Sequence, residues 1–156
     1  MKMEDAMHRQ TTLKCLIAAG LLTACSQNST SEANVSSDTP AANAVDTLSG
    51  AKFADFKGDP GAGAASFAQC KACHVIDAGV NRMGPSLHAV VGRKAGSVEG
   101  FRYSPANKAS GIVWSEAKLF EFLESPRRVI PGTTMGFAGI SDPQKRADII
   151  AYLKAN

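Results

Sequence analysis

The pattern Cys-x-x-Cys-His, formed by Cys70, Cys73 and His74, restricts this chain more than any other feature of its sequence. Two cysteines at this spacing are compatible with a redox dithiol, half of a zinc site or a disulfide. A histidine directly after the second cysteine is typical of covalently attached haem. In that arrangement the histidine binds the iron from one side. We therefore expect one haem c, bound covalently.

The two alternatives to haem are weaker. A zinc site is disfavoured because the three residues are packed too closely for the usual ligand spacing, and no second cluster of Cys and His follows downstream. A thioredoxin-like dithiol would need a βαβ pattern, which the sequence lacks. Secretion, indicated by the N-terminus, also favours haem.

Residues 1–24 are predicted to be a lipoprotein signal peptide. An uncharged, mostly apolar run at residues 15–24 follows several basic residues and is too short to span a bilayer as a mature helix. It leads into "LTAC", which resembles the bacterial lipoprotein cleavage site and predicts lipidation of Cys25. The alternative is an ordinary cleavage site beside an ordinary cysteine. Translation starts at Met1 or at Met7, which gives a more basic leader.

No pair of cysteines is left for a structural disulfide. Cys15 is removed with the leader, Cys25 is predicted to carry the lipid, and the other two form the haem motif. Residues 25–57 are predicted to be the lipid-bearing cysteine and a disordered tether, since this stretch is rich in Ser, Asn, Ala, Asp and Thr and has few large apolar residues. A flexible chain of that length has a reach of roughly 30 Å. The tether would keep the rest of the chain near a membrane.

Residues 58–156 are predicted to form one all-α domain with three main helices. Its 12 Lys and Arg against 8 Asp and Glu give a net charge of +4, which is too mildly basic for nucleic-acid binding. The first helix follows the cap Asp59 and runs into the cysteine motif. The second spans residues 115–125, with Ser115 as its cap, and Pro126 ends it. The third begins after Asp142.

A long stretch between the first two helices, residues 77–111, is dense in Gly, Pro, Asn and Ser. An empty compact domain rarely contains so much irregular chain. It is explained if the loops wrap around a rigid apolar cofactor that supplies the missing core. Composition therefore indicates a cofactor independently of the motif.

The second axial ligand of the iron must come from elsewhere in the chain, and three residues compete. Met83 directly precedes a Gly-Pro pair on the connection that leaves His74, whereas Met135 lies in "PGTTMGF", flanked by turn residues. Met135 is favoured. A lone loop histidine such as His88 is more often solvated or bonded to backbone. A methionine ligand makes an electron carrier, while an open position permits ligand binding or catalysis.

Five motifs now agree in order and spacing: "GDPGAGAASFAQCKACH", "GPSLHAVVGRKAG", "YSPANKASGIVW", "PRRVIPGTTM" and "RADIIAYLK". Together they resemble class I cytochrome c of the mitochondrial type and its bacterial relatives, over nearly all of residues 58–156. The resemblance implies a small cytochrome c fold with the haem attached at Cys70 and Cys73 and ligated by His74 and Met135. It also implies that Pro85 orients His74 through its carbonyl.

Further cofactor-binding residues are implied by the same resemblance. Four side chains would surround the haem propionates: Arg93, Tyr103, Asn107 and Trp114. Thr133 would donate its hydroxyl near them or to a buried water. Phe122 departs from the family, which usually has a tyrosine there, so we expect a looser polar network beside Met135.

The charge pattern of the chain also differs from that of the family. Positions that are often lysine in freely diffusing relatives are occupied by uncharged or acidic residues: Gln69, Thr134, Ser141 and Asp142. Three arginines remain: Arg82, Arg127 and Arg128. We expect the tether to replace part of the charge steering by raising the local concentration.

The resemblance implies a monomeric one-electron carrier and no enzymatic activity. Its partners would be respiratory or photosynthetic membrane complexes on the outer, periplasmic side of the bacterial cytoplasmic membrane. The expected donor is a quinol:cytochrome c reductase-like complex and the expected acceptor a terminal oxidase or similar complex. The competing classes are a haem enzyme, such as a peroxidase, and a haem-based ligand sensor. Both would need an accessible iron position.

Overall fold

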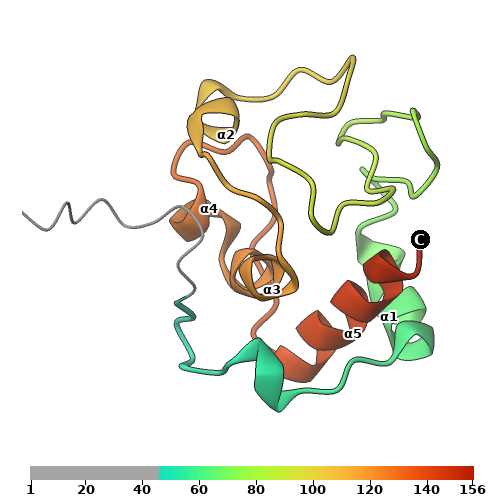
Figure 1. Cartoon of the computed structure of the whole chain (residues 1–156), viewed down its shortest axis with the longest axis vertical. Helices are drawn as coiled ribbons and strands as arrows, with labels where there is room; N and C mark the ends of the chain where they lie inside the picture. Colours follow the sequence, from blue (N-terminus) through green and yellow to red (C-terminus); the bar gives the residue numbers. More distant parts are fainter. Residues whose placement is uncertain (1–45) are drawn as a thin grey trace, which may run out of the picture. The chain divides into compact units, whose positions relative to one another are not determined.

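The computed structural model describes residues 46–156, which form a helical domain (Figure 1). Its elements in chain order are η1 (Phe53–Asp55), α1 (Pro60–Ser66), η2 (Phe67–Gln69), α2 (Pro105–Ala109), α3 (Glu116–Glu124), α4 (Pro126–Val129) and α5 (Pro143–Lys154). The only extended pairing within these residues is an isolated bridge between Lys94 and Val113. The predicted all-α cytochrome c fold is confirmed. None of the helices described is long and apolar enough to cross a bilayer.

The three main helices start at the predicted caps. The Asp59 carboxylate accepts a hydrogen bond from the Ala62 amide at 2.9 Å, and the Ser115 hydroxyl accepts one from Lys118 at 3.0 Å. Asp142 accepts from the amides of the first turn of α5 at 2.9 and 3.2 Å. Each cap satisfies backbone donors that have no partner within the helix.

Helices α1 and α5 cross in close contact, and Gly63 makes this possible. A Cβ atom at Gly63 would lie 2.0 Å from the carbonyl oxygen of Asp148, so only glycine allows this approach. One turn later the Phe67 ring packs 5.1 Å from that of Tyr152. The Asp148 carboxylate also accepts a hydrogen bond from the Asp59 amide at 2.9 Å. Gly63, Phe67 and Tyr152 thus form the crossing of the N-terminal and C-terminal helices.

Two short helices were not predicted. Helix α2 begins with a capping Ser104, which accepts a hydrogen bond from the Asn107 amide at 3.2 Å, and has Pro105 at its first position. Helix α4 begins at Pro126, the residue expected only to end the preceding helix. Proline at a first helical position lacks only an amide that would have no partner there, so it can end one helix and start another.

The predicted tether ends earlier than expected. Residues 46–57 pack against the helical domain, with the rings of Phe53 and Phe56 each 5.7 Å from that of Phe120. The reason is that two phenylalanines three residues apart bury enough apolar surface to order a segment that is polar on average. The predicted signal peptide, Cys25 and the tether before residue 46 lie outside the described residues.

Candidate functional site

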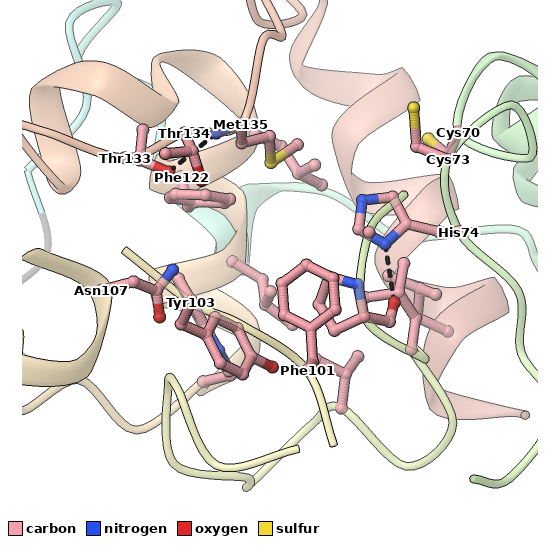
Figure 2. Close-up of a pocket in the computed structure, with 18 of the residues that line it drawn as sticks. Cys70, Cys73, His74, Phe101, Tyr103, Asn107, Phe122, Thr133, Thr134 and Met135 are labelled. Carbon is pink, nitrogen blue, oxygen red and sulfur yellow. Dashed lines mark hydrogen bonds between the residues drawn. The ribbon is translucent and has the colours of Figure 1, made fainter. Parts of the chain in front are cut away.

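A cavity of about 430 Å³ lies between the irregular loops and the helices α3 and α5, with mostly apolar walls. All ten predicted cofactor-binding residues line it: Cys70, Cys73, His74, Pro85, Arg93, Tyr103, Asn107, Trp114, Thr133 and Met135. They come from segments up to 65 positions apart in the chain. Figure 2 shows His74 and Met135 extending toward the same space from different segments, with both cysteine sulfurs beside the histidine.

One wall of the cavity is formed by the turn that contains Cys70, Cys73 and His74. The amides of Cys73 and His74 both donate to the Cys70 carbonyl, at 3.1 and 2.9 Å, so the three residues form one tight turn. Both cysteine side chains are partly buried. Burial raises the pKa of the Cys70 thiol, and the neighbouring Cys73 raises it further. The turn therefore presents two cysteine sulfurs and an imidazole to one face of the cavity.

The imidazole of His74 is held in one orientation. Its Nδ1 lies 2.8 Å from the Pro85 carbonyl oxygen, to which it donates, so Nε2 is left as the lone-pair nitrogen facing the cavity. Burial lowers the pKa of His74, although the hydrogen bond to Pro85 opposes this shift. The neutral imidazole is the form that binds a metal ion.

Gly84 supports this histidine and was missed by sequence reasoning. A Cβ atom there would lie 2.4 Å from Cε1 of His74, so any other residue would displace the ring. The Gly84 amide also donates to the Cys73 carbonyl at 2.8 Å, which ties the loop to the motif. The only signal in the sequence was its place before Pro85.

The thioether of Met135 enters the cavity from the loop between α4 and α5. The Met135 amide donates to the Thr133 hydroxyl oxygen at 3.2 Å, which fixes the turn. Thr133 was expected to donate its hydroxyl into the site. Here its oxygen accepts from the backbone while its proton stays available. Met83, the competing methionine, lies at the cavity margin with 77% of its surface exposed.

Four further polar or aromatic residues, predicted to surround the propionates, line the cavity. The Arg93 guanidinium donates to the carbonyls of His88 and Ser86, at 2.6 and 2.8 Å, so it ties down a loop as well as lining the cavity. Burial raises the pKa of Tyr103, although a hydrogen bond with the Val98 backbone and the charge of Arg93 oppose this shift. Buried Trp114 packs 4.8 Å from the Phe122 ring.

One buried polar atom in this wall has no partner. The side-chain oxygen of Asn107 is buried without a hydrogen bond to any of the described residues. Buried amides are normally satisfied, so this position indicates a polar group or water in the cavity. Phe122 also lines the cavity. It has no hydroxyl at a position where the family usually has a tyrosine.

The apolar walls contain residues that sequence reasoning did not assign to the site. They include Leu87, Val90, Phe101, Ile149 and Leu153. The apolar face of α5 could have indicated the last two, which lie four residues apart. The first three are in irregular loops, where no periodicity identifies a buried side.

The donor set fits a covalently bound haem. Two thiols for the thioether bonds, an oriented imidazole and a facing thioether surround one apolar cavity, with an unsatisfied amide at its polar wall. When bound, haem supplies one-electron redox chemistry at its iron.

Comparison with known proteins shows the family of the chain. The family model "Cytochrome c" matches residues 61–156. Cytochrome c type-1 of Ascaris suum is 48% identical over 99 residues, which cover 63% of this chain and 88% of that protein. Cytochrome c2 of Rhodopila globiformis is 54% identical over 85 residues, covering 54% of this chain and 80% of that protein.

A solved structure is similar as well. Cytochrome cH from Methylobacterium extorquens has 50% sequence identity and a TM-score of 0.61, covering 64% of this chain and all of that one. With its family model, its relatives and its cavity in agreement, the chain belongs to the cytochrome c family of electron carriers and has one covalently bound haem c.

Proposed function

We propose that this cytochrome c carries single electrons between membrane-bound redox complexes on the outer side of the bacterial cytoplasmic membrane. A quinol:cytochrome c reductase-like complex is the proposed donor and a terminal oxidase the proposed acceptor. The observation that carries the proposal is that one cavity brings together Cys70, Cys73, His74 and Met135. If His74 and Met135 both bind the iron, a bound haem would have no open position for a substrate and would supply electron transfer alone.

In this proposal Cys70 and Cys73 would form the thioether attachments, and His74 and Met135 would be the ligands of the iron. Pro85 holds the His74 ring, and the turn stabilised by Thr133 presents the Met135 sulfur. Tyr103, Asn107, Trp114 and Arg93 form the polar end of the cavity, where the haem propionates would lie.

The visible spectrum of the ferric protein tests the ligand assignment. A sulfur-to-iron charge-transfer band is expected in the wild type and should be absent in Met135→Ala. The matched control is Met83→Ala, because Met83 borders the same cavity but is exposed, and this variant should keep the band. A high-spin wild-type haem that binds carbon monoxide readily would instead support an enzyme or a ligand sensor.

We also propose that Cys25 bears a lipid and anchors the chain to the membrane. The support is the sequence "LTAC" at the end of the apolar leader. Mass spectrometry of the mature protein would show acyl groups on Cys25 together with the haem adduct. A mature N-terminus without acyl groups would contradict the anchor but not the electron-carrier function.

A further inference from the structure

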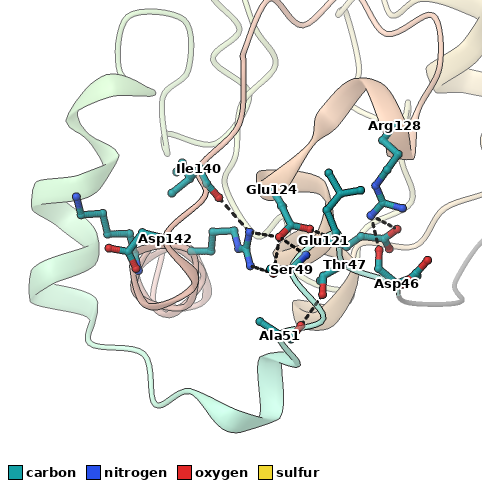
Figure 3. Close-up of polar contacts among 12 residues, drawn as sticks. Asp46, Thr47, Ser49, Ala51, Glu121, Glu124, Arg128, Ile140 and Asp142 are labelled. Atoms are coloured by element: carbon teal, nitrogen blue, oxygen red, sulfur yellow. Dashed lines mark hydrogen bonds and ion pairs between the residues drawn. The ribbon is translucent and has the colours of Figure 1, made fainter.

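Residues 46–56, here called the strap, are held against α3 by contacts that the haem cavity does not use. The Glu124 carboxylate accepts three hydrogen bonds from the strap: from the Leu48 amide at 2.5 Å, the Ser49 amide at 3.2 Å and the Ser49 hydroxyl at 2.6 Å (Figure 3). A carboxylate that receives two successive amides and a hydroxyl binds a specific backbone conformation.

The core of the domain fixes this carboxylate in place. Glu124 pairs at 2.8 Å with Arg146 of α5, whose side chain has no exposed surface. The Arg146 guanidinium also donates to the Ile140 carbonyl at 3.0 Å and lies 4.3 Å from the centre of the Phe120 ring. Because buried groups set its position, the Glu124 carboxylate is already placed to accept hydrogen bonds from the strap.

A second polar contact holds the beginning of the strap. The Arg128 guanidinium donates to the backbone carbonyl of Asp46 and also to the Glu121 carboxylate, the latter at 3.1 Å (Figure 3). Glu121 is itself buried and pairs with Lys118 at 2.6 Å. Two acidic residues one turn apart on α3 thus position both contacts, while Phe53 and Phe56 add the apolar contact with Phe120.

We propose that the strap is a docked end of the N-terminal extension, which fixes the point where the chain leaves the domain. Asp46, the first described residue, is bound by Arg128 of α4, whereas Lys57 lies shortly before α1. In Figure 1, α4 and α1 lie on opposite sides of the domain, and the turn with Cys70 and Cys73 follows α1 through η2. Docking therefore leaves the cysteine-bearing edge of the site on the side away from the exit.

The docking of the strap is independent of the proposed membrane anchor. Its consequence for electron transfer, the orientation of the domain, depends on that anchor. An anchored domain whose chain leaves at Lys57 would have its cysteine side next to the anchor. With the strap docked, the tether is twelve residues shorter, from Asp46 to Lys57, and the cysteine side is free to face a partner. The strap would then orient the carrier as well as restrain it.

Proteolysis of the haem-loaded full chain tests the docking. Ser49→Pro removes the amide and the hydroxyl that bind Glu124, and trypsin cleavage after the exposed Lys52 should become roughly ten- to a hundredfold faster. Ser49→Ala, which removes only the hydroxyl, should show a smaller increase. Asp55→Asn, an exposed change in the strap, is the control. Equal cleavage rates in wild type and Ser49→Pro would overturn the docking.

The orienting role is tested in membrane vesicles supplied with a quinol. Reduction of Ser49→Pro should be several-fold slower than that of wild type and Asp55→Asn. In detergent, where the anchor imposes no orientation, all three should be reduced at the same rate. Faster cleavage of Ser49→Pro without any change in its reduction in membranes would overturn the orienting role. A mature chain recovered without lipid would contradict the proposed anchor, and the proteolysis result would be unaffected.

Discussion

The α1–α5 pair and the loops around the cavity are stabilised in different ways. The two helices contact each other directly, with no space for a side chain at Gly63. The loops of residues 75–113 instead place half-buried aromatic side chains, such as Phe101 and Tyr103, around a volume of about 430 Å³. One region is complete as a protein structure, whereas the other is completed by the haem. The comparison implies that losing the haem and disturbing the helix pair damage different parts of the molecule.

The largest effect is expected when covalent attachment is removed. Without the haem, the loops around this cavity lose the apolar surface against which they pack. In the haem-free form of Cys70→Ala/Cys73→Ala the loops around the cavity should therefore lose their fixed packing while α1 and α5 stay in contact, and the near-UV circular dichroism should decrease. The loop amides should exchange with solvent faster than those of α1 and α5.

The control is Cys70→Ala alone, which keeps one attachment and should retain the haem and the folded loops. Uniform exchange in the haem-free double variant, with loops as protected as helices, would contradict the division between the two regions.

The next largest effect concerns the helix pair itself. In Gly63→Ala the new Cβ would meet the Asp148 carbonyl at 2.0 Å, and neither backbone can move without separating the helices. We expect a loss of about 3 kcal/mol in the free energy of unfolding, measured by guanidinium denaturation, although alanine favours the helix. The exposed Ala65→Ser on the same helix should change it by less than about 0.5 kcal/mol. Equal values for both variants would show that the crossing tolerates a side chain.

The two regions also differ in what the sequence could predict. Capping residues such as Ser115 and Asp142 define helix starts by local chemistry, and those predictions were right. The cavity walls were not predictable in the same way, because Leu87 and Val90 lie in loops without periodicity. The strap was missed for a related reason: the composition of residues 25–57 as a whole concealed Phe53 and Phe56. Gly84 needed the backbone geometry around His74.

A smaller effect is expected at low pH, from the carboxylate that links the strap to α5. Burial opposes ionisation of Glu124, but hydrogen bonds from Ser49 and Leu48 and the charge of Arg146 outweigh it and lower its pKa to about 2. Since this lies below the value of about 4.3 for an unfolded chain, the carboxylate stabilises the fold fully above about pH 4.3. The full shift is equivalent to about 3 kcal/mol, which screening by solvent reduces to about 2 kcal/mol, and this contribution should be lost as the pH falls from there to about 2.

The difference in unfolding free energy between wild type and Glu124→Gln measures that contribution. It should be largest near pH 6 and should shrink steadily below about pH 4.3. Glu99→Gln, which changes an exposed carboxylate in a loop, should show no such dependence. A difference that stays constant from pH 6 to pH 2.5 would mean that Glu124 is not held ionised by these contacts.

The smallest effect is expected from restoring the hydroxyl that Phe122 lacks. Phe122 is buried in the cavity wall against Trp114, on the same cavity as Met135. In Phe122→Tyr the added hydroxyl brings a polar group into this wall, where it changes the electrostatic surroundings of the iron more than the packing. The reduction potential should shift by less than about 60 mV, equivalent to tenfold in the redox equilibrium. The pH at which alkali removes the methionine ligand should change with it.

Phe56→Tyr is the matched control for this last change, because Phe56 also packs on an α3 aromatic but lies outside the cavity. It should leave both the potential and the alkaline transition at their wild-type values. If Phe122→Tyr does the same, the polar surroundings of Met135 are set by other residues of the wall, such as Thr133. The missing tyrosine would then be only a packing substitution within the region that depends on the haem.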